Sequence, residues 1–361
     1  MKRTRLPLRR TLLANFFFSL GVITATRFFT KMPPQFGGEK LAMLSDTSTG
    51  SGAVKTPAIR VFTIQHNGRP FLRDWFKYHS TLFGADAVSV IDHNSTDEDV
   101  TAYTKYIART GAIVKHFSGS FSKKHDLLSD MMRESDGDIL IPLDIDEFIV
   151  KFVGDNITTS RDEILSSLNQ LSNIGDGRRF RFQLIHAVPS SVCLDGPKRL
   201  RPASCVDTFL RLDGHRCSCS SKSFYPKKGF IATDQGNHGG VMAMDARDIL
   251  ANFTVVAPAS LSWGPKSCPY FHASDLAIVH YGSFLPWELY MEKNMNGARL
   301  YNHTARVDAS LPCGGGNGRH YCQFYRDYSI QGEAAVRSRY IASIPAPNLH
   351  NHEIKTLLTR E

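Results

Sequence analysis

Two aspartates stand two residues apart at the end of a strongly apolar run in residues 138–150 (DILIPLDIDEFIV). Side chains alternate in an extended segment, so we expect Asp144 and Asp146 to point to one side and Ile145 to point into the core. Two like charges this close repel unless a cation lies between them, and carboxylate oxygens suit Mg²⁺ or Mn²⁺. The spacing therefore predicts a divalent metal site that can bridge a diphosphate. It also predicts that Asn at either position relieves repulsion and leaves the bare domain at least as stable.

A second polar cluster, residues 92–97 (DHNSTD), directly follows the apolar segment 87–92. Turn formation alone explains the Asn, Ser and Thr residues of this cluster, but it does not require an acid on the last strand residue. Open α/β sheets bind ligands beyond the carboxyl ends of their strands. Asp92, Asn94 and Asp97 are therefore predicted to contact a bound cofactor or donor, with Asp92 near a ribose or a base.

Alternating apolar runs and helical patterns position these clusters. Strands are predicted at residues 59–64, 87–92, 112–117 and 138–150, and helices follow residue 71 and cover 100–110 and 125–134. This alternation indicates an α/β fold with a mostly parallel, Rossmann-like sheet. We predict one domain over residues 58–345 and a C-terminal tail over 346–361, with only loops and short strands assigned between residues 173 and 236.

The N-terminal residues indicate a membrane anchor. Residues 1–10 carry five Lys or Arg and no acid, and residues 11–30 are mostly apolar. Residues 31–57, rich in Pro, Gly, Ser and Thr, are predicted to form a flexible stem. This order predicts a single-pass type II membrane protein of the Golgi or ER with a lumenal catalytic domain. A cleaved signal peptide and an organellar transit peptide remain alternatives.

Charge and cysteine content limit the other classes. The five basic residues of the tail account for most of the formal charge of +9, and no basic stripe with aromatic residues follows, so no nucleic-acid partner is expected. An oxidising lumen predicts two or three disulfides among the seven cysteines. Possible N-glycosylation sites are Asn156, Asn252 and Asn302. The cysteines are Cys193, Cys205, Cys217, Cys219, Cys268, Cys313 and Cys322.

Several segments occur in an order that resembles a known family. Residues 64–99 and then 139–150 (ILIPLDIDEFIV) look like the N-terminal half of the family 2-like glycosyltransferases that carry a DxDEF motif. Later segments are similar too: KSFYP with Lys222, GNHGG with His238, and IVHYGSFLPWELYMEKNMNGA with His280 and Lys293. The resemblance covers about residues 58–300 in that order.

This resemblance implies a GT-A fold and a nucleotide-sugar donor. It assigns Asp144 and Asp146 to the metal and the diphosphate, places Asp92 near the nucleoside, and makes His280 a third metal ligand. The sequence departs from the family at His66, where relatives usually have Asn-Glu at this point in the loop, and residues 190–221 have no counterpart. The acceptor, whether glycan, protein or lipid, therefore stays open.

The resemblance implies inverting transfer, which needs a carboxylate base near the acceptor hydroxyl, and Glu147, Asp234 and Asp275 are the candidates. Lys222 is either a contact of the donor phosphate or a surface lysine. His238 is a candidate for donor binding because two glycines let the backbone approach a ligand, and Lys293 is expected on a helix face in solvent.

Two other readings compete with an active transferase. One is a haloacid-dehalogenase-like phosphatase, which normally opens its domain with the Asp-x-Asp motif. The other is a catalytically inactive GT-A domain that acts as a carbohydrate-binding or scaffold protein. Both aspartates are present, which favours an active, metal-dependent enzyme.

Overall fold

The chain is described by a computed structural model that defines most of the predicted catalytic domain. All described residues lie in the unit Val54–Glu361. They are residues 56–69, 71–154, 156–174, 177–189, 206–211, 222–234, 236–238, 240–243, 271–282, 284–301, 313 and 318–344. The predicted basic tail, the membrane anchor, residues 31–55 of the stem and the C-terminal tail lie outside them.

Four parallel strands form one part of a ten-stranded sheet. They are β1 (Ile59–Gln65), β2 (Val88–Asp92), β3 (Ile113–His116) and β4 (Ile139–Pro142), in the order β3-β2-β1-β4. Every residue of β2 and β4 is buried, as is usual for central parallel strands covered on both faces. This part confirms the predicted α/β alternation.

The rest of the sheet mixes both strand directions. From β4 the order continues β9-β7-β12-β5-β6, with β8 paired to β7, and of these pairs β7–β12 is parallel. A separate two-stranded sheet pairs β10 with β11. The bounds are β5 Glu147–Val153, β6 Asn156–Thr158, β7 Arg179–Pro189, β8 Val206–Arg211, β9 Ser223–Pro226, β10 Phe230–Thr233, β11 Gly240–Met242 and β12 Phe271–His280.

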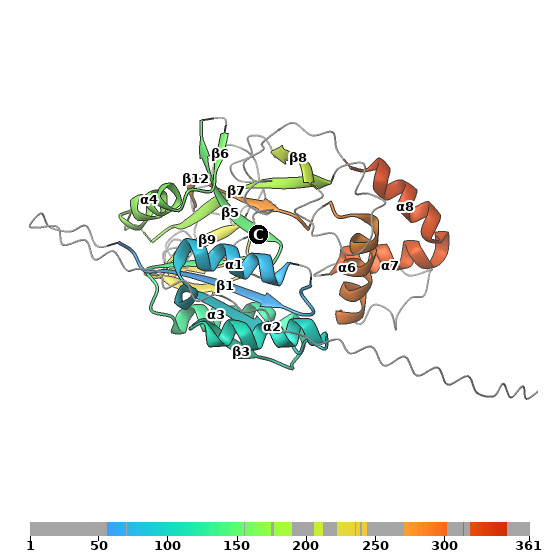
Figure 1. Cartoon of the computed structure of the whole chain (residues 1–361), viewed down its shortest axis with the longest axis horizontal. Helices are drawn as coiled ribbons and strands as arrows, with labels where there is room; N and C mark the ends of the chain where they lie inside the picture. The colour runs from blue at the N-terminus through green and yellow to red at the C-terminus, as the bar shows by residue number, and fades with distance from the viewer. Residues whose placement is uncertain are drawn as a thin grey trace, which may run out of the picture. The chain divides into compact units, whose positions relative to one another are not determined.

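Helices cover the sheet in layers (Figure 1). Buried residues of α1 (Leu72–Phe83), α2 (Glu98–Arg109) and α4 (Arg161–Ser172) belong to one core cluster, and α3 (Lys124–Glu134) packs in a second cluster with β10 and β11. The one-turn helices are η1 (Ala85–Ala87) and η2 (Phe121–Lys123). The sheet with these two clusters of helices forms a three-layer α/β arrangement.

Three C-terminal helices form a third core cluster. They are α6 (Trp287–Leu300), α7 (Arg319–Gln331) and α8 (Glu333–Ala342). Trp287, Phe324, Val336 and Tyr340 are its buried residues. In Figure 1 these helices lie together, beyond the end toward which β1 points. They therefore close one side of the region where ligands bind in open α/β sheets.

The predicted single strand over residues 138–150 is wrong, because a turn divides it. β4 ends at Pro142 and β5 begins at Glu147. β4 pairs with β1 and β9, whereas β5 pairs with β12 and β6. The backbone N–H of Glu147 donates to the carbonyl of Asp144 at 3.1 Å, which closes the turn. The chain thus leaves the parallel part of the sheet at the two aspartates.

No helix among the described residues is long and apolar enough to cross a membrane. One described pair of cysteines, Cys313 and Cys322, forms a disulfide, which confirms part of the predicted pairing. The other five cysteines lie outside the described residues. Of the three predicted glycosylation sites, Asn156 is described, and it is exposed on the short strand β6.

Candidate functional site

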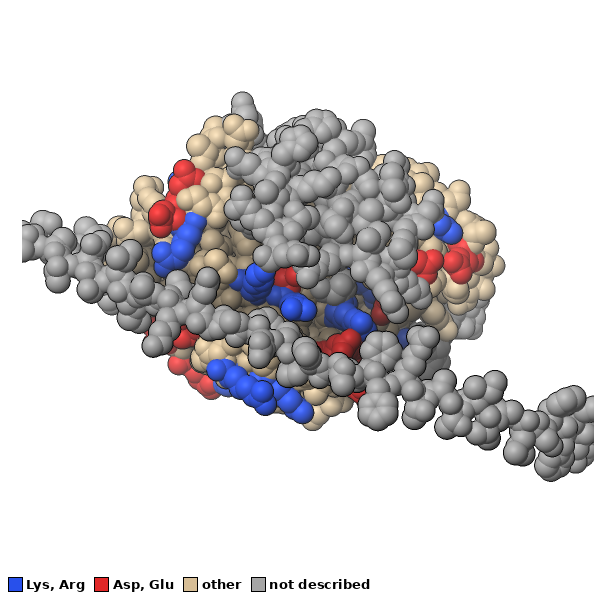
Figure 2. Space-filling view, in the orientation of Figure 1, with Lys and Arg blue, Asp and Glu red and all other residues tan. Residues whose placement is uncertain are grey.

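A cleft of about 930 Å³ lies beyond the carboxyl ends of β1 and β4. Its walls come from the loop after β1, the turn between β4 and β5, strands β7 and β12, and helices α6 and α7. In Figure 2, Lys and Arg side chains lie beside Asp and Glu side chains across the middle of the visible face. The predicted site residues that line the cleft are Asp144, Asp146, Lys222, Asp234, His238 and His280.

Glu147 holds the turn that carries the two aspartates. Its Oε2 accepts a hydrogen bond of 2.9 Å from the backbone N–H of Asp144. The side chain is fully buried, and burial raises the pKa of Glu147, against the lowering effect of the Lys222 ammonium. Ile145 is half-buried and lines the cleft instead of pointing fully into the core, because the segment is a turn and not an extended strand.

Asp144 pairs with a buried lysine. The Nζ of Lys222 lies 2.6 Å from its Oδ2 and 3.1 Å from Oε1 of Glu147, and it donates to the carbonyl of Gly236 at 2.7 Å. The Lys222 side chain is 5% exposed. Burial raises the pKa of Asp144, but Lys222 and Lys124 more than offset this and bring it below its usual value. Asp144 is therefore held ionised by the ammonium groups beside it.

Asp146 pairs with a lysine and a histidine from later in the chain. The Nζ of Lys293 on α6 lies 2.9 Å from Oδ2 of Asp146, and Nε2 of His280, at the end of β12, lies 3.4 Å from the same oxygen. Burial raises the pKa of Asp146, but Lys293 and His280 bring it well below its usual range. Strands β4 and β12 and helix α6 thus meet at one carboxylate.

Gly282 is what lets these groups meet. A Cβ at this position would lie 1.7 Å from Oδ2 of Asp146 and 2.4 Å from Nζ of Lys293. The carbonyl of Gly282 also accepts a hydrogen bond of 3.1 Å from Nζ of Lys293. The residue therefore combines close approach with a backbone acceptor, which only a glycine supplies here.

Lysine side chains of the chain itself offset the predicted repulsion between Asp144 and Asp146. Lys222 and Lys293 each bind one carboxylate, and Nζ of Lys124 lies 3.8 Å from Oδ1 of Asp144. Removing either charge leaves an ammonium group short of its partner. This reverses the expectation that Asn at these positions leaves the bare domain at least as stable.

A second histidine lies beside His280. His186 of β7 is its register partner, and the two ring centroids are 5.7 Å apart. Burial, helped by the nearby His280, lowers the pKa of His186 to about 4. The Nδ1 of His186 is buried without a hydrogen-bond partner among the described residues. His186 is thus a neutral ring in the cleft wall at ordinary pH.

Asp92 sits below the cleft in a network of its own. Its side chain is 5% exposed, and Oδ1 accepts hydrogen bonds from Nε2 of Gln65 and from Oγ of Ser95. Oδ2 lies 3.1 Å from Nδ1 of His116. Gln65, and not Asp92, is among the described residues that line the cleft. The structure therefore places Asp92 behind the loop that a ligand would touch.

Asn94 and Asp97 lie in the loop between β2 and α2. Asp97 is the N-cap of α2, and its Oδ1 accepts from the backbone N–H of Val100 at 3.1 Å. Asn94 is exposed, with a φ of 50°. Oδ1 of Asn67 accepts from the backbone N–H groups of Thr96 and Asp97, which joins this loop to the loop after β1. Neither Asn94 nor Asp97 is among the described residues that line the cleft.

Asp234 and His238 form a tight loop between β10 and β11. Oδ1 of Asp234 accepts from the backbone N–H groups of Gly236 and His238 at 3.2 and 2.8 Å. The carbonyl of His238 accepts from Oγ of Ser223 at 2.8 Å, which ties the loop to β9. Both side chains line the cleft beside Lys222.

The three candidate bases have different positions. Glu147 is fully buried under the turn, and Asp275 binds Ser167 at 3.0 Å and Lys151 at 3.4 Å. Neither is among the described residues that line the cleft, whereas Asp234 is. Of the three, Asp234 is therefore the one whose side chain borders the cleft.

A divalent cation fits at Asp146 and His280. These two side chains present an oxygen and a nitrogen 3.4 Å apart, and Mg²⁺ is commonly held by one or two protein ligands together with substrate phosphates. Among the described residues there is no cluster of three acidic, His or Cys side chains placed to hold an ion. Asp144, the remaining predicted ligand, is occupied by Lys222. Lys293 already fills the cation's place at Asp146, so an ion there must displace it.

Sequence reasoning missed several residues of this site, among them Lys124, His186, Lys293 and Gly282. Lys293 was expected on a solvent-facing helix surface, but it binds Asp146, and Gly282 was not considered. Lys293 lies in the same family-like segment as His280, and a loop and about two turns of helix separate the two residues. The only sequence signal for a role of Lys293 in the site was that it shares this segment with His280. Nothing in the helical pattern distinguishes a lysine that points into a cleft from one that points into solvent.

No family model matches the chain, and no curated protein sequence matches it. Among solved structures, S. aureus TarS 1–349 is 13% identical, with a TM-score of 0.33 over 76% of this chain and 72% of that chain. The structure of the same protein in complex with UDP-GlcNAc is 13% identical, with a TM-score of 0.32 over 80% of this chain and 82% of that chain. Glucosyl-3-phosphoglycerate synthase from Mycobacterium tuberculosis, in complex with Mn²⁺, UDP and phosphoglyceric acid, is 13% identical to this chain. Its TM-score is 0.30 over 68% of this chain and 78% of that chain. TM-scores this low assign neither a fold family nor an activity to this chain.

Proposed function

We propose that this chain is a glycosyltransferase that takes its sugar from a nucleoside-diphosphate donor and transfers it with inversion to an acceptor hydroxyl. The main support for this proposal is the charge cluster beyond the end of β4, where Asp144 and Asp146 meet Lys222 and Lys293 inside a cleft of about 930 Å³. A cleft of this size accommodates a ligand as large as a nucleotide sugar. Its position beyond the carboxyl ends of parallel strands is where open α/β sheets bind such ligands.

The donor's diphosphate would lie at the charge cluster, because this is where mobile positive charge is available. Lys293 keeps 35% of its side chain exposed and can move from Asp146 to a phosphate oxygen. Lys124, 15% exposed and 3.8 Å from Asp144, is a second ammonium in the same wall. Both can stabilise the negative charge that develops on the leaving diphosphate.

A divalent cation, Mn²⁺ or Mg²⁺, would be held by Asp146 and His280 together with the donor. When bound, it supplies further positive charge to the leaving group. The chain's own residues then hold the nucleoside end against the loop of Gln65, His66 and Asn67, which lines the same cleft. Asp234 accepts the proton of the attacking hydroxyl in this proposal.

The donor site can be tested by thermal unfolding of the full chain with UDP and GDP, each with Mn²⁺. A nucleotide at about 100 times its dissociation constant adds roughly 2.7 kcal/mol to the free energy of unfolding. The wild type should show the corresponding rise in Tm, and Asp146→Asn should lose most of it. Asp86→Asn is the matched control, since Asp86 is 80% exposed and lies outside the cleft lining.

Turnover is tested separately by donor hydrolysis and transfer with Mn²⁺. A wild type that binds nucleotide but neither hydrolyses nor transfers the sugar would favour the inactive carbohydrate-binding or scaffold protein. Asp234→Asn should lower the transfer rate by a factor of about 100 or more and leave nucleotide binding intact. No nucleotide-dependent shift for the wild type would contradict the proposal itself.

We also propose that the domain works in the lumen of the Golgi or ER, held by residues 11–30 as a type II anchor. The disulfide Cys313–Cys322 supports an oxidising compartment, and Asn156 is an exposed acceptor for a glycan. Endoglycosidase treatment of the membrane fraction should lower the apparent mass. Absence of a shift together with organellar localisation would favour the transit-peptide alternative.

A further inference from the structure

One wall of the cleft is aromatic, and the proposed donor site assigns no ligand to it. Phe121, Tyr301, His320 and Tyr321 line it, and they come from η2, the end of α6 and the start of α7. The rings of Tyr301 and Tyr321 stack at 5.9 Å with an interplanar angle of 24°. Phe121 meets Tyr301 edge-on at 5.8 Å. We define these four residues as the aromatic wall.

Two glycines position the tyrosines. A Cβ at Gly297 of α6 would lie 2.5 Å from the ring of Tyr321, and one at Gly318 would lie 2.7 Å from the ring of Tyr301. Each ring therefore packs against bare backbone, and Gly318 also has a φ of 78° that disfavours other residues. Both rings are thus positioned by close packing against the backbone of a neighbouring segment.

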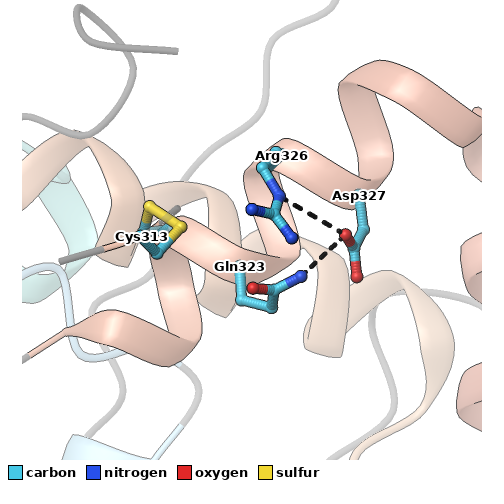
Figure 3. Close-up of a disulfide and its surroundings, with 5 residues drawn as sticks. Cys313, Gln323, Arg326 and Asp327 are labelled. Carbon is cyan, nitrogen blue, oxygen red and sulfur yellow. Dashed lines mark hydrogen bonds and ion pairs between the residues drawn. A yellow bond between two sulfur atoms is a disulfide. The ribbon is translucent and has the colours of Figure 1, made fainter. Parts of the chain in front are cut away.

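The start of α7 is fixed by covalent and polar links. Cys313 and Cys322 form a disulfide (Figure 3). Gly318, His320 and Tyr321 lie between these two cysteines in the sequence. One turn further along α7, Asp327 accepts from Gln323 at 2.8 Å and pairs with Arg339 of α8 at 3.1 Å. The part of the aromatic wall that comes from α7 is therefore held in place by the disulfide and by these polar contacts.

We propose that the aromatic wall binds a sugar ring of the acceptor, so that the acceptor is a glycan. This inference rests on the proposed function. The apolar C–H face of a sugar packs on an aromatic ring, and the hydroxyl groups need polar partners nearby. Glu292 and Asn296, one helical turn apart on α6, and His320 line the same cleft. Ring faces with a few polar groups are the arrangement that binds small polar ligands with a defined orientation.

The wall also lies near the reacting end of the proposed donor. The ring of Tyr321 packs against Gly297 of α6, one helical turn beyond Lys293, and Tyr321, Lys293 and Asp146 line the same cleft. Tyr321 thus lies on the side of the charge cluster formed by α6, while the loop that would hold the nucleoside follows β1. A sugar on this wall would lie beside the leaving diphosphate, as transfer requires. A lipid chain would need a continuous apolar surface, which the charged and amide groups of α6 interrupt.

The test measures binding of lactose, maltose and chitobiose to the full chain by saturation-transfer NMR, at about 10 mM sugar for affinities in the millimolar range. UDP and GDP binding is measured in parallel. Tyr301→Leu should weaken saccharide binding about tenfold, because a lost ring contact of about 1 kcal/mol or more is a factor of five to ten. Tyr301→Phe keeps the ring and should retain binding. Tyr106→Leu, in a tyrosine 40% exposed on α2, is the matched control.

Each outcome decides between the possibilities. If Tyr301→Leu does not fold, Tyr321→Leu replaces it, and the wild-type measurement is decisive by itself. Wild-type protein that binds nucleotide but none of the saccharides overturns the glycan inference and leaves the donor proposal standing. Weaker nucleotide binding by Tyr301→Leu with unchanged saccharide binding would show that the wall holds the nucleobase, which also overturns it. If neither ligand class binds, the proposed function fails as well.

To identify where the glycan is carried, octyl glucoside below its micelle concentration is compared with methyl glucoside. Equal ring-dependent binding of the two indicates that the sugar alone is recognised, as expected for a free or protein-linked glycan. Tighter, still ring-dependent binding of octyl glucoside indicates a lipid-linked glycan. Binding of octyl glucoside that Tyr301→Leu leaves unchanged would come from the alkyl chain and would contradict the proposal.

Discussion

The strands on either side of β1 each end in acidic residues, but the two clusters are neutralised in different ways. Asp92, at the end of β2, is held mainly by uncharged donors, the amide of Gln65 and the hydroxyl of Ser95. Asp144 and Asp146, beyond the end of β4, are held by the ammonium groups of Lys222 and Lys293. Asp92 is buried behind the cleft, whereas Asp144 and Asp146 line it.

The difference separates a network of mostly uncharged partners behind the cleft from a network of paired charges that lines it. Around Asp92 the hydrogen bonds link the loop after β1 to the loop after β2, so the network shapes a wall. Around Asp144 and Asp146, opposite charges are paired in a cleft where an incoming phosphate or cation can exchange with them. Acidic residues at strand ends therefore do not all have one role, and the partner groups distinguish them.

The largest effect is expected at Lys222. Lys222→Met removes the ammonium group from two carboxylates, one of which, on Glu147, is fully buried. Leaving a buried charge without its partner costs about 3–5 kcal/mol. Urea unfolding should show this loss for Lys222→Met and a much smaller one for Lys293→Met, whose lysine is 35% exposed. Equal losses would mean that the two lysines are equivalent, contrary to the structure.

A smaller effect is expected at Asp92. Asp92→Asn keeps one carbonyl oxygen for Gln65 and Ser95 but loses the charge-assisted part of these bonds and the acceptor facing His116. The free energy of unfolding should fall by about 1–3 kcal/mol. Nucleotide binding with Mn²⁺ should weaken only through this loss of support. A full loss of binding with unchanged stability would place Asp92 in direct contact with the ligand instead.

The acidic cluster beyond β4 should also have a distinct pH response. The pKa of Asp146 lies well below its usual range, so its contribution is present above the unfolded-state value of about 4 and is lost as pH falls through the folded-state value. Asp146→Asn should cost about 1 kcal/mol, since Lys293 is partly solvated. Urea titrations should show this difference constant from about pH 8 to pH 5 and shrinking below about pH 4. A difference that stays unchanged down to about pH 3 would contradict the pairing of Asp146 with Lys293.

The sequence predicted the parallel part of the fold well because its signals are local. The strands near residues 59–64, 87–92 and 112–117 and the helices near 100–110 and 125–134 are confirmed within two residues at each end. Buried parallel strands are continuous apolar runs, and the helices between them have a regular apolar face. His79 of α1 is fully buried against Trp75.

The site was predicted only in part because its partners come from distant segments. Asp144 and Asp146 stand out by spacing, but the division of their strand depends on Glu147 folding back to the backbone of Asp144. A polar side chain binding backbone three residues away looks, in sequence, like any acidic residue after a strand. Likewise the pairing of Asp146 with Lys293 spans 147 positions, and no local pattern encodes it.

The smallest effect on stability, with the sharpest effect on the site, is expected at Gly282. An alanine there would place a Cβ 1.7 Å from Oδ2 of Asp146 and 2.4 Å from Nζ of Lys293, so these two side-chain ends must move. Both atoms are the far ends of side chains, and Lys293 is partly exposed, so we expect Gly282→Ala to change the free energy of unfolding by less than about 1 kcal/mol. The network of Asp92 with Gln65, Ser95 and His116 should stay intact, because Gly282 takes no part in these hydrogen bonds.

Binding should respond far more than stability, because Asp146 and Lys293 both belong to the proposed diphosphate site. We expect the Mn²⁺-dependent rise in Tm with UDP or GDP to fall to near zero in Gly282→Ala. Gly332→Ala is the matched control for inserting a methyl group, since a Cβ at Gly332, between α7 and α8, meets nothing within 4 Å, although its φ of 80° adds backbone strain. That control should lower Tm somewhat and keep the full nucleotide-dependent rise. Retention of the rise in Gly282→Ala would show that the close approach of Asp146 and Lys293 is not needed for donor binding.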